Sequence, residues 1–235
     1  MNRFWEIDFL RGVAIVMMAL FHFLWDLNYF NLIQVSLYAG GWGIFQKATA
    51  SLFLLLAGIV LTINYSRRKD FIPEFLRRGT TVFALGLVIT AATYIFLREE
   101  FIYFGILHLI GLSIILSVPL VRRKFLNLFA GAALIIAPAV YNLQSLAITP
   151  LVWMGLAPPF TALDFFPLIP WFGVVLIGIF LGNVLYGGGI PKIKTVEPNG
   201  KIAGFFEVLG RNSLLIYFSH QFVLFPLAYI ISVLI

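Results

Sequence analysis

The sequence predicts an all-α protein, a polytopic bundle of about seven transmembrane helices. Hydrophobic residues fill 61% of the 235 positions and charged residues only 11%, whereas an ordinary soluble domain has about 25% charged residues. The apolar residues lie in long runs, and a helix needs roughly 20 of them to cross a bilayer. Short basic segments separate these runs. We therefore expect one domain, residues 1–235, that crosses a cell membrane several times.

Each expected span is an apolar run bounded by polar, glycine or proline residues. Between the second and third spans, residues 66–78 mix apolar and charged side chains as an interfacial helix does. Residues 142–164 contain three prolines around an apolar run that is too short to span, which predicts a re-entrant or surface-lying segment. The expected spans are residues 9–30, 43–65, 79–97, 101–121, 125–141 and 165–186, and a last one from about residue 205 or 211 to 235.

Loops that carry lysine and arginine alternate with loops that lack them. Five bases lie between spans two and three, three between spans four and five, and three between the last two spans, whereas the other loops have none, one and none. Cytoplasmic loops are enriched in these residues, so the pattern places the N-terminus inside and the C-terminus outside. The bases are Arg67, Arg68, Lys69, Arg77, Arg78, Arg122, Arg123, Lys124, Lys192, Lys194 and Lys201.

Composition argues against several other classes of function. The net charge of +6 sits in short loops and forms no basic arm, which argues against nucleic acid as a partner. Cysteine is absent, so disulfides, thiolate metal sites and a cysteine acyl carrier are excluded. No histidine or carboxylate spacing resembles a metal site. The expected partner is the lipid bilayer, and a homodimer is one option for the assembly.

The first span carries a stripe of ionisable side chains, which are Asp8, Arg11, His22 and Asp26. Eleven helical steps amount to about three turns, so Arg11 and His22 leave the same face roughly 16 Å apart. Asp8 can reach Arg11, and Asp26 can reach His22. Ionisable groups are costly in a bilayer and usually mark function. The stripe also interrupts the run in a way that favours a retained span over a cleaved signal peptide.

Each member of the stripe has a structural and a functional interpretation. His22 is either a core histidine bonded to Asp26 for helix packing, or a general base that this acid orients; both groups could also relay protons in a transporter. Arg11 either anchors the helix through Asp8 or Glu6, or binds phosphate in its fork.

Seven further positions are candidates by their depth, their helical face or their place at a helix end. Lys47 and His108 enter their spans at a depth similar to that of His22. Lys47 either neutralises Asp26 or acts in catalysis, and His108 has a packing or a site role. On the last helix Tyr217 and His220 share a side, whereas Arg211 faces away from His220. The segment Arg211, Asn212 and Ser213 either caps this helix or contributes to a site.

One residue pair and three short segments resemble motifs of known membrane acyltransferases. Arg11 followed after ten residues by His22 resembles the signature of the membrane-bound acyltransferases that O-acetylate bacterial envelope sugars. Three segments are more similar to a related group, the small prokaryotic membrane proteins that resemble the catalytic domain of heparan-alpha-glucosaminide N-acetyltransferase. These segments are Glu6–Gly12, Phe104–Gly111 and Gly210–Leu214 with His220. The chain departs from the larger relatives in having fewer expected spans and no extended lumenal domain.

The resemblance implies transfer of an acetyl or other acyl group from cytosolic acyl-CoA to an acceptor, often a sugar, on the opposite side. It places the catalytic histidine at His22, which Asp26 would hold. The main alternative is a small-molecule or proton-coupled transporter that uses the same stripe. Under the acyltransferase hypothesis the supporting or oxyanion-stabilising groups are Lys47, His108, Tyr217 and His220, and acyl-CoA meets Asp8, Arg11, Arg211, Asn212 and Ser213.

Overall fold

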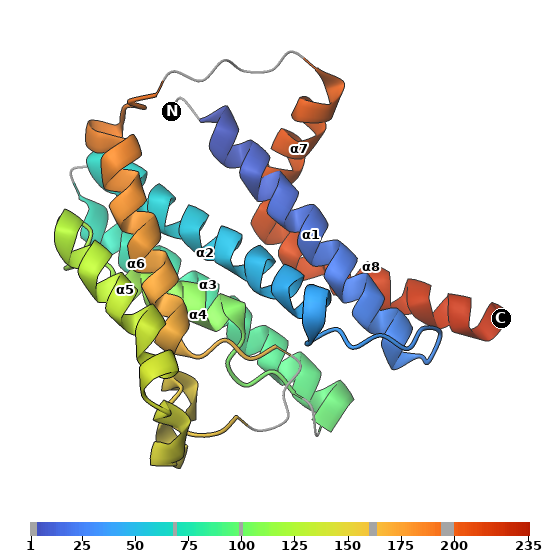
Figure 1. The fold of residues 1–235 in the computed structure, drawn as a ribbon. Helices are drawn as coiled ribbons and strands as arrows, with labels where there is room; N and C mark the ends of the chain where they lie inside the picture. Colours follow the sequence, from blue (N-terminus) through green and yellow to red (C-terminus); the bar gives the residue numbers. More distant parts are fainter. Residues whose placement is uncertain (1–3, 68–69, 99–100, 160–163, 194–199) are drawn as a thin grey trace. The chain divides into compact units, whose positions relative to one another are not determined.

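The computed structural model describes residues 4–67, 70–98, 101–159, 164–193 and 200–235, and these form helices joined by short loops (Figure 1). The α-helices are α1 (Trp5–Tyr29), α2 (Gly40–Arg67), α3 (Phe71–Leu97), α4 (Ile106–Leu116), α5 (Lys124–Val140), α6 (Leu168–Leu185), α7 (Lys201–Arg211) and α8 (Ser213–Leu234). The 3-10 helices are η2 (Leu143–Leu146), η3 (Thr149–Met154) and η4 (Gly187–Gly189).

Seven of these helices occupy the places of the seven expected spans. Five of them, α1, α2, α3, α6 and α8, are long and apolar enough to cross a membrane, and α4 and α5 are shorter apolar helices. The described residues contain no strand. The predicted fold class, a polytopic membrane helix bundle, is confirmed.

The segment before the third span differs from the prediction. Residues 71–78 are not a separate interfacial helix, because α3 already begins at Phe71. Pro73 lies in the first turn of α3, where a helix tolerates proline. The rings of Tyr65 and Phe71 lie 4.6 Å apart, and Phe75 is 2% exposed. The segment is therefore the first part of α3, and the contact with Tyr65 packs it against the preceding helix α2.

The region before the last span and the proline-rich segment each contain short helices. Asn212 separates α7 from α8, so the last span agrees with the later of its two expected starts, residue 211, and residues 205–211 belong to the separate helix α7. Residues 142–159 contain the short helices η2 and η3, and residues 160–163 lie outside the described ranges. Whether this segment is re-entrant or lies at the surface remains a prediction.

The chain forms two compact units, each described here by itself. Unit 1 consists of Met1–Phe53 and Thr195–Ile235, and unit 2 of Leu54–Lys194, so that α2 contributes to both. The expectation of a single domain stays a prediction.

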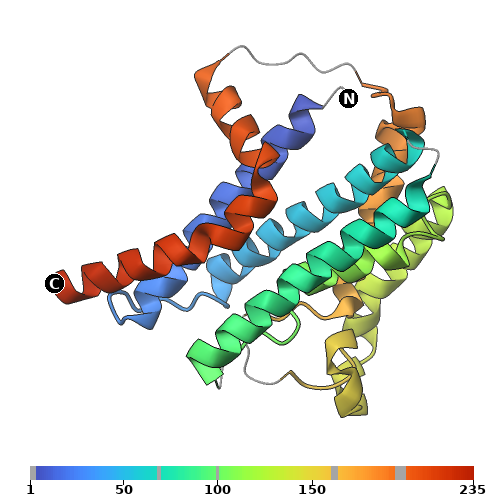
Figure 2. The same cartoon turned by 180° about the vertical axis from the view of Figure 1, so that it is seen from behind.

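In unit 1, α1 lies against α7 and α8 (Figures 1 and 2). Ring contacts pair His22 with His220 and Phe30 with Tyr229, so α1 and α8 run in the same direction. The first and last of an odd number of membrane spans must run in the same direction. The start of α1 instead packs antiparallel against α7, where a Cβ on Gly12 would come within 1.9 Å of the Phe206 carbonyl oxygen. Only glycine permits so close a crossing.

In unit 2, neighbouring helices alternate in direction as successive spans must. The chain passes closely at Gly79 and Gly111 between antiparallel α3 and α4, and at Gly131 and Gly173 between antiparallel α5 and α6. Small residues allow such approach between membrane helices. Thr62 on α2 donates a hydrogen bond to the Ile179 carbonyl on α6 at 3.2 Å.

The basic loops after α2, α4 and α6 lie at the same end of unit 2. Arg67 at the end of α2 donates to the Gly189 carbonyl at 3.2 Å. The guanidinium of Arg122, before α5, lies 5.1 Å from the ring centre of Tyr65 and 5.8 Å from that of Phe71. The loops after α2, α4 and α6 therefore meet at the same end. The positive-inside rule assigns this end to the cytoplasm, and Arg68, Lys69 and Lys194 lie outside the described residues.

Candidate functional site

Two histidines from the first and last helices meet in unit 1. The imidazoles of His22 on α1 and His220 on α8 have centroids 4.7 Å apart and planes at 80°. The Nδ1 of His22 bonds to the Met18 carbonyl at 2.9 Å, and that of His220 to the Tyr217 carbonyl at 2.6 Å. Because a carbonyl can only accept, both Nδ1 atoms carry hydrogen. In the neutral rings both Nε2 atoms therefore keep a lone pair that can take a proton.

Asp26 has a different partner from the one expected. It is fully buried, and its Oδ1 accepts a hydrogen bond from Gln221 Nε2 on α8 at 2.6 Å. Within the described residues it forms no hydrogen bond with His22, so the predicted pairing of these two residues is wrong. The reason is that Met18, one turn before His22, already takes its Nδ1 hydrogen. The tautomer of His22 is set by its own helix.

Lys47 and Tyr217 have different places in unit 1. Lys47 on α2 is exposed and makes no ion pair with Asp26 among the residues described. The option that it neutralises Asp26 is therefore not realised. The ring centroid of Tyr217 lies 5.6 Å from that of His220 and 6.4 Å from that of Phe53. Tyr217 and His220 thus share a side of α8, as their spacing predicted.

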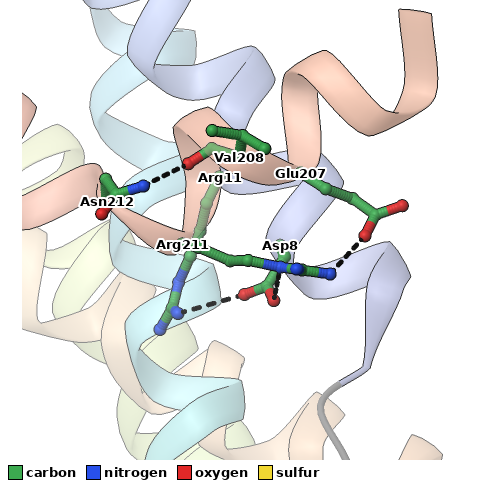
Figure 3. Close-up of polar contacts among 6 residues, drawn as sticks. All are labelled: Asp8, Arg11, Glu207, Val208, Arg211 and Asn212. Carbon is green, nitrogen blue, oxygen red and sulfur yellow. Dashed lines mark hydrogen bonds and ion pairs between the residues drawn. The ribbon is translucent and has the colours of Figure 1, made fainter. Parts of the chain in front are cut away.

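Four charged side chains join α1 to α7 and form what we call the charged cluster, drawn in Figure 3. Arg211 lies between two carboxylates, with Nη2 at 2.7 Å from Glu207 Oε2 and Nε at 3.5 Å from Asp8 Oδ2. Arg11 Nη1 is 3.9 Å from Asp8 Oδ1. The predicted contact of Asp8 with Arg11 is therefore present. The fold brings Arg211 from the far end of the chain to the same carboxylate.

The charged cluster depends on a very close helix crossing. A Cβ on Gly210 would come within 1.7 Å of the Asp8 carbonyl oxygen, so the backbones of α7 and α1 touch there. Asn212 donates from Nδ2 to the Val208 carbonyl of α7 at 2.9 Å (Figure 3), and its side chain does not cap α8. Ser213 is the first residue of α8.

A protein-family model matches the chain. The model of the family described as heparan-alpha-glucosaminide N-acetyltransferase, catalytic, matches residues 3–222, nearly the whole chain. The chain belongs to this family. The match ends within α8, and it includes the charged cluster, His22 and His220. Comparison with curated proteins and comparison with solved structures give no match.

Membership in the heparan-alpha-glucosaminide N-acetyltransferase family, together with the apolar helices, makes this chain a multi-pass membrane protein of acetyltransferase type. Neither the family nor the fold assigns a role to any single residue, so the predicted catalytic and binding roles stay predictions. The homodimer is likewise untested. Among the described residues no group of three or more His, Asp or Glu side chains could hold a metal ion.

His108 lies in unit 2 of this acetyltransferase and has partners for both ring nitrogens. Its Nδ1 accepts from the Gly105 N–H at 3.1 Å, so its hydrogen must be on Nε2, which lies 3.3 Å from Thr90 Oγ1. Thr90 in turn donates to the Ile102 carbonyl at 2.5 Å. A Cβ on Gly86 would come within 3.0 Å of the His108 ring. The network joins α3 to the start of α4, and this geometry favours the packing role for His108.

Sequence reasoning missed two residues: Glu207 of the charged cluster, and Gln221, the hydrogen-bond partner of Asp26. Glu207 is 5% exposed although α7 is short and near polar loops. Gln221 follows His220 directly, and adjacent residues of a helix point about 100° apart, so helical spacing does not place Gln221 on the same face as His220. A signal was nevertheless present, because an amide within an apolar span seeks a polar partner on another helix.

Proposed function

We propose that this acetyltransferase moves an acetyl or other acyl group from cytoplasmic acyl-CoA to a hydroxyl or amino group of a sugar at the outer side of the membrane. The observation that carries this proposal is the orientation of His22. Its Nδ1–H is held by the Met18 carbonyl, so Nε2 is available as a base next to a second imidazole. The family supports acetyl transfer in general.

The proposed chemistry needs one base and one thioester. His22 Nε2 removes the proton of the sugar hydroxyl or amine, whose oxygen or nitrogen attacks the thioester carbonyl carbon. The new C–O or C–N bond forms, the C–S bond breaks, and the imidazolium returns the proton to the CoA thiolate. The hydroxyl of Tyr217 is proposed to stabilise the oxyanion, and His220, whose Nε2 keeps a lone pair, to relay this proton. Without cysteine, an acyl group carried transiently on His22 is the covalent variant.

The donor is proposed to enter from the charged cluster. Arg211 and Arg11 are 46% and 22% exposed at their side chains, and a guanidinium binds phosphate oxygens in a fork. The paired carboxylates Asp8 and Glu207 hold these arginines in place and make the cluster neutral before phosphate arrives. Along the continuous helix α1, Arg11 lies roughly 16 Å from His22, a span that the extended arm of acyl-CoA matches.

The decisive experiment replaces His22 in purified, detergent-solubilised protein. We expect His22→Ala to lower acetyl transfer by about 100- to 10,000-fold, because a positioned base contributes about this much. The measurement is CoA release and transfer of label from labelled acetyl-CoA to a panel of glycans. Asn183→Leu, which removes a hydrogen bond from α6 to the Val121 carbonyl in the turn before α5, serves as the control for loss of packing. Full activity of His22→Ala would remove His22 from the chemistry.

The same protein distinguishes transfer from transport. In proteoliposomes a transporter would accumulate the sugar or ion without releasing CoA. An acetyltransferase releases one CoA for each acetyl group transferred. Sugar uptake without CoA release would contradict the proposed function and favour the transporter.

A further inference from the structure

Beside His22, three buried acceptor atoms lack a donor. They are Asp26 Oδ2, His220 Nε2 and Gln221 Oε1, and each is buried without a hydrogen-bond partner among the described residues. We call Asp26, His220 and Gln221 the polar cluster. Asp26 is fully buried, and Gln221 reaches it with its amide nitrogen at 2.6 Å. An unmade hydrogen bond in a buried place costs free energy, so three of them together need an explanation.

All three atoms are acceptors for the same reason. His220 has its hydrogen on Nδ1, where the Tyr217 carbonyl accepts it, which leaves a lone pair on Nε2. Gln221 uses its NH2 group on Asp26, which leaves its carbonyl oxygen. The second carboxylate oxygen of Asp26 completes the set. A ligand complementary to the polar cluster must therefore bring several O–H or N–H donors.

Helix packing alone accounts for only part of the polar cluster. One hydrogen bond between Gln221 and Asp26 would join α1 to α8, as polar side chains often do in membranes. Such a role does not need three further acceptors next to a histidine that can act as a base. A sugar carries several hydroxyl or amino groups on neighbouring atoms, so one such molecule can supply several donors at once.

We propose that the polar cluster binds and orients the sugar that receives the acyl group, with Gln221 and Asp26 as positioning residues that accept hydrogen bonds from its hydroxyl or amino groups. This inference rests on the proposed function for the transfer step. The binding itself is independent of acetyl-CoA. His22 then contacts the reacting group, whereas Gln221 and Asp26 hold the groups beside it.

Thermal unfolding of the solubilised protein with D-glucose or D-glucosamine tests this binding without chemistry. A ligand that binds only the folded state raises the midpoint temperature with concentration. We expect such a rise in the wild type, and its loss in Asp26→Asn and Gln221→Met. Asp26→Asn can still accept the hydrogen bond from Gln221, and its NH2 group replaces the unpaired oxygen Oδ2. The unfolding temperature of this variant without sugar should therefore match that of the wild type. A packing role predicts no loss of the sugar response in this variant.

Steady-state kinetics provide the second readout. Gln221→Met should raise the KM for the sugar about tenfold, the usual effect of one lost hydrogen bond, and leave the KM for acetyl-CoA unchanged. Asn183→Leu should change neither constant. No midpoint shift with either sugar in the wild type, or a shift retained in Asp26→Asn, would overturn the inference. A sugar shift without acetyl transfer would instead contradict the proposed function alone.

Discussion

The three histidines of this chain differ in what their ring nitrogens contact. His22 and His220 donate from Nδ1 to carbonyls of their own helices, whereas His108 accepts at Nδ1 from the Gly105 backbone. The first arrangement leaves Nε2 for a substrate proton. The second uses both nitrogens within the fold. Hydrogen-bond partners, and not residue type, therefore separate candidate bases from structural histidines.

Replacement of His108 should affect stability more than chemistry. His108→Ala leaves the Gly105 N–H without its acceptor, and we expect a loss of about 1–3 kcal/mol in the free energy of unfolding. Tryptophan fluorescence during thermal unfolding in detergent measures this loss. Thr81→Ala is the control, because that hydroxyl bonds only to the Arg77 carbonyl of its own helix. Unchanged stability together with lost acetyl transfer would place His108 in the chemistry instead.

Spacing along a single helix was enough to predict some contacts between individual residues of the site. The contact between Asp8 and Arg11 and the shared side of Tyr217 and His220 follow from spacing within one helix. The partner of Asp26 does not, because Gln221 is 195 residues away and spacing within a helix carries no information about the neighbouring helix.

At the scale of elements, α7 buries a carboxylate and exposes large apolar side chains. It buries Glu207 and exposes Ile202, Phe205 and Val208. A helix in water shows the opposite pattern, so lipid explains this arrangement. The buried carboxylate is compensated by Arg211. α7 is therefore attached to α1 by charge, by backbone contact and by the rings of Phe9 and Phe206, whose centroids lie 5.3 Å apart.

Two glycines should control the attachment of α7. Gly210→Ala would put a Cβ into the Asp8 carbonyl, so α7 must move away from α1 and the charged cluster must open. We expect a lower unfolding temperature and weaker acetyl transfer, and the same from Gly12→Ala. Gly204→Ala on the same helix meets nothing within 4 Å and should be neutral or slightly stabilising. Equal behaviour of the Gly204 and Gly210 variants would contradict a tight crossing.

At the scale of the whole molecule, direction within each unit agrees with alternating spans. α1 and α8 run parallel, as the first and seventh spans should, and α3 runs antiparallel to α4. Arg67, at the end of α2, and Arg122, in the loop after α4, lie at the same end of unit 2. Together with the positive-inside rule, this predicts a cytoplasmic N-terminus and an external C-terminus.

Single cysteines can test this topology without removal of native ones, because the chain has none. Arg123 and Gln144 flank α5 and are exposed. In intact cells a membrane-impermeant maleimide should label Gln144→Cys and Ile235→Cys, and should label Arg123→Cys only in inverted vesicles. Labelling of Arg123→Cys and Gln144→Cys from the same side would show that α5 does not cross the membrane.

The amino-acid sequence by itself determined the membrane class, the places of the seven apolar helices and the stripe of Asp8, Arg11, His22 and Asp26. These follow from hydropathy and from the period of one helix, which are local properties. Three contacts could be found only in the folded chain. Arg211 and Arg11 both contact Asp8, Asp26 is hydrogen-bonded to Gln221 instead of His22, and the ring of His220 lies against that of His22. These contacts join opposite ends of the chain, and the one between Arg211 and Asp8 depends on backbones that approach closely at Gly12 and Gly210.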